Sequence, residues 1–541
     1  MKDENLSLEN YFDRAFYLQS YPDIAKAGID PFEHYCTSGW REGRNPSVAF
    51  DTQFYLQRNP DIAEAGINPL DHYVFTGRHE GRQATPPMGG VKACIQRAFQ
   101  TVLDANHDPV TPAESVMSVD RLSELLAENL LDGPTILSVS HDDYRVNVGG
   151  VQKLISVEQH VCADISWNYL HLSPAVPQKG LANQSPGLPF AVSVHLNGKK
   201  LGNVTSASFI KAFLQTRAKG EPVHAIVHHL MGHDPTAIGD IIEETGCDRV
   251  VFWVHDFFTL CSGIQLLRND IVYCHAPSPA SMACGICCHG EDRPVFLARI
   301  GAFFSRFTPF VMAPSEAALA IWRKHSSFSH EEALARPLGR LLLSDSRIPF
   351  AAGVTDNPIR IAFLGLRNHI KGWMIFQNLA LHFRNDSRYE FHHIGLVHDI
   401  PAAGNIIHTP VNIATDGEDA MIQAVSARNI DVVINWSLWP ETFCYAAYEA
   451  LAGGAFVLAP DGDGNVPIIL RQIVPEQGLL LKREEDLSSL LSTGKLSDIL
   501  KLSNRRRGYL LRQGDSVTWL RELSMDQTAV CSEANLEMQD D

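Results

Sequence analysis

From Pro134 onward, short apolar runs alternate with helical segments, and this alternation constrains the fold of the 541-residue chain more than any other feature. Residues 135–139, 250–255 and 359–364 have the composition of buried strands, and each run is followed by polar residues and a helical pattern. Strands that alternate with helices form parallel sheets with helices on both faces. A chain of this length has room for two or three domains, so we expect two α/β domains of this kind.

Residues 431–454 carry the clearest functional pattern of the chain. The apolar run at 432–434 predicts a strand, and residues 443–451 predict a helix that begins beyond a polar turn. Free N–H groups and the positive dipole end at such a helix start favour an anionic ligand above the sheet. Glu441 and Glu449 lie eight positions apart, or about 12 Å along a helix. They can therefore contact different parts of one elongated ligand.

Glu441 and Glu449, in the frame PETF followed by EALAGG, resemble the E-x7-E motif of retaining glycosyltransferases with the GT-B fold. The resemblance implies an α/β architecture of two facing Rossmann-like domains that binds a nucleotide-sugar donor. It places Glu441 near the transferred sugar and Glu449 on the ribose. The alternative is an amphipathic helix with two solvated glutamates, which the strand–turn–helix frame disfavours.

Two further positions resemble the same family. Gly149 and Gly150 follow the strand at 135–139, where paired glycines let the backbone approach a ligand closely. The pair resembles the glycine loop that faces the donor phosphates and the acceptor; the alternative is a pair that closes a turn. His255 ends the strand at 250–255 and is followed by Asp256, and the pair resembles a His-Asp of the family whose histidine contacts a hydroxyl of the transferred sugar. The alternative is a capping histidine or an aspartate N-cap for the next helix.

Cationic residues follow the strand at 359–364, in the segment GLRNHIKGW. A strand, a glycine turn and cations at a helix start form a cradle for a diphosphate. The segment resembles the G-R-L…K-G segment of the same enzymes, but Arg367 lies one residue nearer the lysine than in the family pattern. Lys371 is therefore the stronger candidate for donor binding, and Arg367 is the weaker one. A basic surface loop is the alternative.

The chain contains eleven cysteines and begins without an apolar signal segment, which indicates thiols or a metal site in place of a disulfide framework. Four thiols are candidate ligands of a tetrahedral structural zinc ion: Cys261, Cys274, Cys284 and Cys287. Cys288 is a fifth thiol and leaves the fourth ligand ambiguous, and reduced thiols packed in a loop are the alternative. No metal cofactor is expected to be essential for catalysis.

Residues 12–44 recur as residues 50–82, a shift of 38 positions. Each copy predicts two or three short helices with aromatic packing, and two such small units are expected to stack. His34 and His72 occupy equivalent positions, which indicates a structural role in place of two identical active sites. The copies resemble a tandem repeat found beside bacterial polysaccharide-assembly glycosyltransferases. That resemblance implies a docking or assembly module.

The predicted order of domains is a helical repeat module over 11–84, a helical linker over 85–132, an acceptor-side domain over 133–335 and a nucleotide-sugar donor domain over 355–525. The polar residues 328–357 are irregular at both ends and are predicted to form an interdomain linker, and residues 505–523 are predicted to form a helix.

The formal net charge of −17 disfavours binding to nucleic acid, which depends on cationic neutralisation of phosphates. No apolar run reaches the length of about 18 residues that a membrane span requires. The expectation is a cytoplasmic protein. Peripheral attachment to the inner membrane, or association with a protein complex through the repeats, stays open.

These features predict a hexosyltransferase that moves a sugar, with retention, from a nucleotide-sugar donor to a glycan or lipid-linked acceptor. The pathway expected from the repeats is bacterial surface polysaccharide synthesis of O-antigen, capsule or exopolysaccharide. Two other functions stay open: a non-catalytic scaffold of a polysaccharide-assembly complex, and a GT-B epimerase that acts on a nucleotide sugar. The nucleotide base, the sugar and the acceptor are not specified by the sequence.

Overall fold

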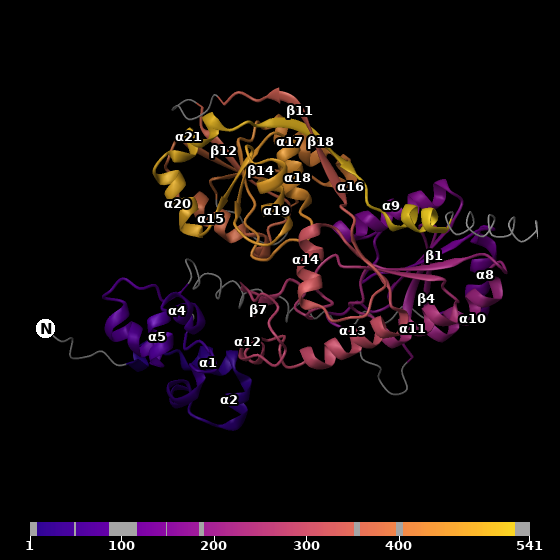
Figure 1. Ribbon diagram of the computed structural model, residues 1–541, viewed down its shortest axis with the longest axis horizontal. Coiled ribbons are helices and arrows are strands. Elements are labelled where there is room, and N and C mark those ends of the chain that lie inside the picture. Colours follow the sequence, from indigo (N-terminus) through magenta and orange to yellow (C-terminus); the bar gives the residue numbers. More distant parts are fainter. Residues whose placement is uncertain are drawn as a thin grey trace, which may run out of the picture. The chain divides into compact units, whose positions relative to one another are not determined.

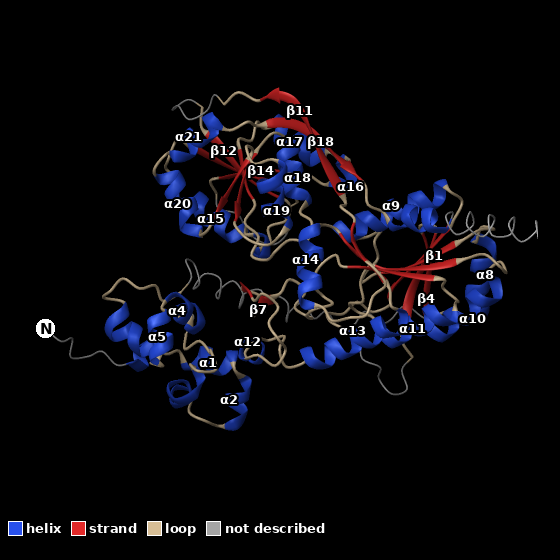
Figure 2. Cartoon of the chain, in the orientation of Figure 1, coloured by secondary structure: helices blue, strands red, loops and turns tan. Residues whose placement is uncertain are grey.

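The computed structural model describes residues 8–47, 50–85, 116–147, 149–182, 189–350, 357–396 and 404–524. The chain forms two compact units (Figures 1 and 2). The first unit comprises Met1–Pro109 and Leu266–Pro294, and the second comprises Val110–Gln265 and Val295–Asp541. Within the described ranges, no helix combines the length and apolar character needed to cross a membrane.

The first unit contains two copies of one helical motif, as the sequence repeat predicts. Each copy has three short α-helices followed by a π-helical turn. The first copy consists of α1 (Arg14–Ser20), α2 (Pro22–Ala27), α3 (Pro31–His34) and η2 (Tyr35–Gly39). The second copy consists of α4 (Thr52–Arg58), α5 (Pro60–Ala65), α6 (Pro69–His72) and η3 (Tyr73–Gly77). The short 3-10 helix η1 (Leu8–Tyr11) precedes both copies.

Equivalent residues begin and end the helices of the two copies. The side chains of Asp13 and Asp51 each accept a 2.9 Å hydrogen bond from a backbone N–H in the first turn of the following helix. Gly28 and Gly66 end α2 and α5 at φ of +66° and +64°, a conformation that glycine adopts without steric cost. Local chemistry therefore places the helix boundaries alike in both copies.

Aromatic side chains fill an interior that the two copies share. This cluster includes Phe12, Tyr17, Tyr35, Trp40, Phe50 and Tyr55. The Tyr17 hydroxyl hydrogen-bonds to Nδ1 of His34 at 2.9 Å, and the Tyr55 hydroxyl bonds to Nδ1 of His72 at 2.8 Å. The two histidines therefore support the fold of their own copies, as predicted, and the copies stack through one core.

The second unit contains two α/β domains, and the first of them is built on an eight-stranded sheet, here the N-terminal sheet. Its strands in spatial order are β10 (Ala333–Ala335), β9 (Phe310–Ala313), β6 (Arg249–Trp253), β5 (Val223–Val227), β1 (Thr135–Val139), β2 (Asn168–Pro174), β3 (Ala191–Leu196) and β4 (Lys199–Thr205). The pairs from β10 to β2 are parallel, whereas β3 pairs antiparallel with both β2 and β4.

Helices cover both faces of the N-terminal sheet, with α9 on one face and α10, α11 and α13 on the other (Figure 1). Successive side chains of a strand point to opposite faces of the sheet, so both faces present apolar residues that need cover. In β6, Trp253 packs in the same core as Leu154 of α9, and the Phe252 ring lies 4.8 Å from the Phe304 ring of α13. The helices of this domain are α8 (Val119–Asn129), α9 (Gly150–Asp164), α10 (Ser206–Thr216), α11 (Pro235–Glu244), α13 (Arg293–Phe307) and α14 (Glu316–His325).

The second α/β domain is built on a six-stranded parallel sheet, here the C-terminal sheet. Its strands in spatial order are β14 (Ile406–Thr409), β13 (Tyr389–Ile394), β12 (Ile359–Leu364), β15 (Val432–Ile434), β16 (Phe456–Pro460) and β17 (Gly478–Leu481). With the strands numbered along the domain, this order is 3-2-1-4-5-6, which is the order of the Rossmann fold.

Helices lie on both faces of the C-terminal sheet (Figure 2), and each face has its own hydrophobic core. One face is covered by α17 (Ala420–Ala427), α18 (Tyr445–Ala452) and α19 (Asn465–Ile468). The other is covered by α15 (Trp373–His382), α20 (Glu484–Ser492) and α21 (Lys495–Leu502). Shorter helical segments are η4 (His369–Lys371), α16 (Ile413–Asp416) and η5 (Ile469–Ile473). The predicted strand–turn–helix at 432–451 is confirmed, with the helix beginning at Tyr445.

One sequence prediction about secondary structure is wrong. Residues 328–357, which were predicted to be irregular at both ends, contain β10 and β11 (Gly339–Arg347). Residues 505–523 were expected to be one helix, but β18 (Arg506–Arg512) pairs antiparallel with β11, and helix follows only from residue 516. Each of these two strands obtains its partner from a distant part of the chain, so neither is recognisable from local sequence. Of the predicted linker over 85–132, residues 86–115 lie outside the described residues, and α8 follows them.

Candidate active site

The predicted site residues follow the strands at which each sheet reverses its strand order. In the C-terminal sheet β12 lies between β13 and β15, and in the N-terminal sheet β1 lies between β2 and β5. At such a switch point the loops diverge and leave a crevice at the carboxyl ends of the strands, where α/β proteins bind ligands. Lys371 follows β12, Glu441 follows β15, and Gly149 follows β1.

Lys371 and Glu441 form an ion pair at the C-terminal switch point. Nζ of Lys371 lies 2.7 Å from Oε2 of Glu441, and the Ser437 hydroxyl donates to Oε1 of the same carboxylate. The lysine side chain is 40% exposed, whereas the glutamate side chain is 2% exposed. Burial acts to lower the pKa of Lys371, but the Glu441 carboxylate outweighs burial and raises that pKa above its usual value. The pair holds a cation where an anionic ligand can reach it.

Gly372 determines how the chain turns directly after Lys371. Its φ is +87°, and an added Cβ would overlap the carbonyl oxygen of Trp436, so no other residue fits without rearrangement. On the other side of the lysine, the Asn368 side chain accepts a 3.0 Å hydrogen bond from the N–H of Ile370 and caps η4. Local turn chemistry therefore fixes the position of the Lys371 backbone.

The residue after Glu441 joins this loop to the N-terminal sheet. The Thr442 hydroxyl donates to the carbonyl oxygen of His255, and the Ser315 hydroxyl donates to the carbonyl oxygen of Thr442 at 2.6 Å. Three residues that were predicted separately, Lys371, Glu441 and His255, are thus brought together around one loop.

Glu449 lies in α18 with a buried carboxylate that is only partly satisfied. Its residue is 2% exposed, and among the described residues no donor hydrogen-bonds to its Oε1. Burial raises the pKa of Glu449, although the cations of Lys153 and Arg512 act in the opposite direction. A buried acceptor without a donor carries a free-energy cost that a ligand hydroxyl would relieve.

Gly150 and Lys153 of α9 lie against the start of α18. A Cβ added at Gly150 would lie 3.7 Å from the Tyr445 ring, and Nζ of Lys153 lies 4.9 Å from the centre of that ring. Gly149 is the N-cap of α9 and has an extended backbone. The paired glycines therefore stand beside the helix that carries Glu449.

His255 is the end of a buried chain of hydrogen bonds. Its Nε2 bonds to Nδ1 of His228 at 3.1 Å, and Nε2 of His228 bonds to a carboxylate oxygen of Glu158 at 3.0 Å. The other Glu158 oxygen accepts from the N–H and the hydroxyl of Ser516, at 2.9 and 2.7 Å. Burial works to raise the pKa of Glu158, but His228 and Ser516 outweigh burial and lower it. Burial, with His228 beside it, holds the pKa of His255 well below its usual value, so His255 is neutral.

Three polar residues near His255 were not named as site residues in the sequence analysis. The His141 and His229 rings lie 4.8 Å apart, and Nε2 of His229 lies 3.1 Å from Oδ2 of Asp256. Burial, reinforced by His229, lowers the pKa of His141 to about 4, so its imidazole is neutral and can hydrogen-bond to a hydroxyl. Each of the three follows shortly after a buried strand, which is the signal that could have identified them.

Arg367 contacts different groups from Lys371. Its Nε donates to Nδ1 of His393 at 3.3 Å, and its guanidinium lies 5.1 Å from the centre of the Trp373 ring. The residue is 8% exposed, and burial lowers its pKa. Its role in donor binding stays a prediction.

The four predicted zinc ligands lie in different surroundings. The Cys284 thiol accepts a 2.8 Å hydrogen bond from Arg293, the Cys287 thiol accepts one of 3.5 Å from the N–H of Asn269, and the Cys261 thiol accepts one of 3.4 Å from the N–H of Gly263. Cys261 belongs to the second unit, whereas Cys274, Cys284 and Cys287 belong to the first. Binding of zinc by these four thiols stays a prediction.

Compared by sequence, the chain matches no family model and no curated protein. Compared by structure, it is similar to a sucrose-phosphate synthase from Thermosynechococcus elongatus, with 15% identity, a TM-score of 0.42, and coverage of 68% of this chain and 92% of that chain. It is also similar to Anabaena HepE in complex with UDP-glucose, with 13% identity, a TM-score of 0.41, and coverage of 73% and 99%. A trehalose 6-phosphate synthase from Burkholderia multivorans matches with 9% identity, a TM-score of 0.39, and coverage of 75% and 100%.

The fold class itself follows from the strand order: the chain is α/β, with two Rossmann-like domains preceded by an all-α repeat module. Two Rossmann-like domains are what the sequence resemblance to the GT-B family implies.

Proposed function

We propose that the chain is a glycosyltransferase that moves a sugar from a nucleotide-sugar donor to a glycan or lipid-linked acceptor in bacterial surface polysaccharide synthesis, with retention. One observation carries the proposal. The loop that follows β15 pairs Glu441 with Lys371 and, through Thr442, bonds to the backbone of His255. A cation, a carboxylate and the backbone of His255 thereby meet at the carboxyl ends of strands from two sheets.

Lys371 is the group proposed to stabilise the departing nucleoside diphosphate. Its side chain is 40% exposed and its positive charge is held in place by Glu441. Charge that develops on the leaving group is the largest electrostatic change in such a transfer, and a preorganised cation lowers its free energy. The start of α18 adds backbone N–H groups at the same end of the sheet. The Lys371 cation and the backbone N–H groups of α18 together support a reaction in which no divalent metal is essential.

Two carboxylates receive separate roles in the proposal. Oε1 of Glu449 is buried without a donor and would accept a hydrogen bond from a ribose hydroxyl. Glu441 lies beside Lys371 and would orient the sugar, together with His255. His141, His229 and Asp256 would contact hydroxyl groups on the acceptor side. No side chain is assigned as a covalent nucleophile.

The test is a thermal-shift screen against a panel of nucleotide diphosphate sugars, followed by an assay of released nucleoside diphosphate with and without acceptor. Lys371→Ala should lower turnover by about 100-fold or more, because removal of one preorganised charge-stabilising group typically has this effect. Lys501→Ala is the matched control, since that lysine is 59% exposed and pairs only with Asp498 in its own helix. Turnover should persist in the presence of a chelator.

Three outcomes would contradict the proposal. Unchanged turnover in Lys371→Ala would remove the proposed role of that lysine. Absence of any stabilisation or turnover with every donor would favour the non-catalytic scaffold. Consumption of donor without acceptor, with an epimeric nucleotide sugar as product, would favour the epimerase. Retention is checked separately by the anomeric configuration of the isolated product.

A further inference from the structure

The segment Leu266–Pro294 belongs to the same compact unit as the repeats, although the chain places it far from them. It contains the two-residue strands β7 (Leu267–Arg268) and β8 (Val272–Tyr273) and the four-residue helix α12 (Met282–Gly285). Elements this short bury little apolar surface and contribute few backbone hydrogen bonds. Small, loop-rich segments of this kind commonly depend on a disulfide or a metal ion for a fixed conformation.

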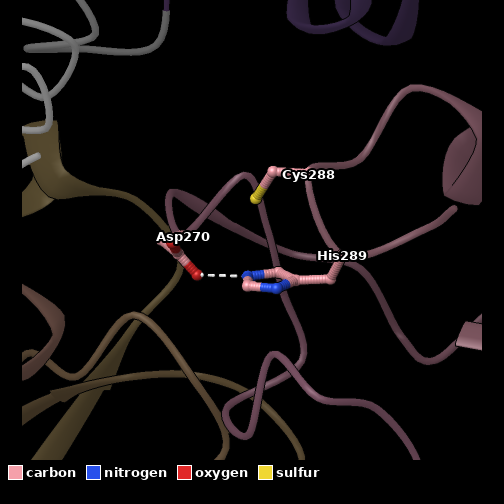
Figure 3. A group of neighbouring side chains, drawn as sticks. All are labelled: Asp270, Cys288 and His289. Carbon is pink, nitrogen blue, oxygen red and sulfur yellow. Dashed lines mark hydrogen bonds and ion pairs between the residues drawn. The ribbon is translucent and has the colours of Figure 1, made fainter. Parts of the chain in front are cut away.

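Three side chains of this segment converge from two loops (Figure 3). Asp270 lies between β7 and β8, and Cys288 and His289 follow α12. Nε2 of His289 lies 2.8 Å from Oδ1 of Asp270, and the ligand atoms of all three side chains lie within 4.8 Å of one another. They form the one cluster of potential metal ligands that meets this distance in the described part of the chain.

Hydrogen bonds through Asn269 hold the two loops together beside the cluster. The Asn269 side chain accepts a 2.8 Å hydrogen bond from the N–H of Cys288, and the N–H of Asn269 donates to the Cys287 thiol at 3.5 Å. The convergence of Asp270, Cys288 and His289 is therefore supported by the backbone on both sides.

We propose that Asp270, Cys288 and His289 bind a zinc ion that fastens the two loops of the segment together. Zinc prefers this donor set of thiolate, imidazole and carboxylate, at about 2.3, 2.0 and 2.0 Å respectively. Ligand atoms around a tetrahedral zinc ion are therefore roughly 3.3–3.6 Å apart. A group whose atoms lie within 4.8 Å reaches that geometry by side-chain movements of about an ångström.

The same geometry favours this trio over the four thiols predicted from sequence. The Cys284 thiol accepts a hydrogen bond from the Arg293 guanidinium, and a cation at that position repels a metal ion. Asp270 and His289 are 42% and 24% exposed in their side chains, so an ion can reach the trio from solvent, and water can complete the tetrahedron.

The bound ion would act on the repeat module through the packing of the first unit. A Cβ added at Gly43 in the first copy would lie 2.7 Å from Cδ1 of Ile286, which shows that the repeat and the segment pack closely. Ile286 lies two residues before Cys288. We therefore expect the ion to rigidify the surface against which the first copy rests.

The test uses the full-length chain, purified under reducing conditions without chelator, and measures bound zinc by elemental analysis. Metal-free protein is then titrated with cobalt, whose absorption bands report tetrahedral coordination and thiolate ligation. Wild type should bind about one equivalent of zinc at this single site. His289→Ala and Cys288→Ser should weaken binding by at least about tenfold, since even the loss of a residue that only supports a metal ligand commonly costs this much.

Two control variants make the result specific. Cys284→Ser alters a thiol of the alternative set and should leave zinc binding unchanged, and so should Cys247→Ser, whose thiol contacts Thr245 in the second unit. Absence of zinc and of cobalt bands in wild type would leave Asp270 and His289 as a simple ion pair and overturn the proposal. Loss of zinc in Cys284→Ser, with zinc retained in His289→Ala, would overturn it in favour of the four thiols. Since the readout is metal content, it is independent of any transferase activity.

Discussion

Replacement of Glu158 should reveal how strongly the second unit depends on one buried carboxylate. Glu158 has no exposed surface, and it accepts hydrogen bonds from four donors. These donors are Nε2 of His228, the N–H and hydroxyl of Ser516, and the Tyr169 hydroxyl. The Glu158→Ala variant removes the acceptor of all four and leaves the donors buried.

The expected loss is large for a single substitution. A buried donor without a partner costs about 1–3 kcal/mol, and removing one member of a buried charged pair costs about 3–5 kcal/mol. Contributions within one hydrogen-bond network do not add. We therefore expect Glu158→Ala to lower the free energy of unfolding by about 4 kcal/mol. Glu158→Gln keeps the shape and the oxygen that faces Ser516, so it should lose roughly half as much.

The pH dependence of stability provides a second measure of how much the Glu158 carboxylate contributes to the fold. The folded structure lowers the pKa of Glu158 below its ordinary value of 4.5, chiefly through His228 acting against burial. A lowered carboxylate pKa stabilises the fold above the unfolded value and loses that contribution as pH falls through the folded value. The excess free energy of unfolding of wild type over Glu158→Gln should therefore be at its full value at pH 7 and should shrink below pH 4.5.

Urea denaturation followed by tryptophan fluorescence is a suitable assay. The indole N–H of Trp253 donates to the Ser516 hydroxyl at 2.6 Å, and its ring stacks on His255 at 5.0 Å, so its emission reports this network. A loss below about 1 kcal/mol for Glu158→Ala would refute the reasoning. The reasoning would also be refuted if the difference in free energy of unfolding between wild type and Glu158→Gln did not change with pH.

Three further predictions concern other parts of the chain. Gly372→Ala should lower the free energy of unfolding by more than about 2 kcal/mol, because a Cβ there meets the backbone of Trp436 at positive φ. Gly365→Ala, at φ +90° with open space around it, should lower it by only about 1 kcal/mol. Similar melting temperatures for the two variants would contradict this. Tyr17→Phe should lower the free energy of unfolding, measured by urea denaturation, by about 1 kcal/mol, because it removes the hydrogen bond to His34. Turnover should stay unchanged, and a loss of turnover would contradict the structural role of Tyr17 and His34. The raised pKa of Lys371 implies that the charged lysine contributes fully to stability below pH 10.5, and that this contribution shrinks as pH rises above 10.5 toward the higher folded pKa. The difference in free energy of unfolding between wild type and Lys371→Met, measured between pH 9 and 12, checks this sign.

Much of the fold follows from local sequence. In the repeats, the caps at Asp13 and Asp51 and the glycines at Gly28 and Gly66 depend only on residues within a few positions, so the helices could be placed without tertiary information. The alternation of apolar runs with helical segments likewise identified both α/β domains. Strand β18 escaped prediction because its pairing depends on β11, far away in the chain.

Some residues of the candidate site could likewise be located from the sequence, and others could not. Sequence order placed Lys371, Glu441 and Gly149 after strands, and a parallel sheet brings the ends of its strands to one edge, so their approximate location was foreseeable. The histidines at 141 and 229 were overlooked because a histidine after a strand carries no motif by itself.

The sequence alone determined the repeat module, the two α/β domains and the identity of the residues at the strand ends, because turns, caps and periodicity act over short distances. Only the tertiary structure decided which of these residues touch. The Lys371–Glu441 pair joins residues 70 positions apart, and the Glu158–Ser516 bonds join residues 358 positions apart. Contacts over such separations depend on strand order and packing, which no local pattern encodes.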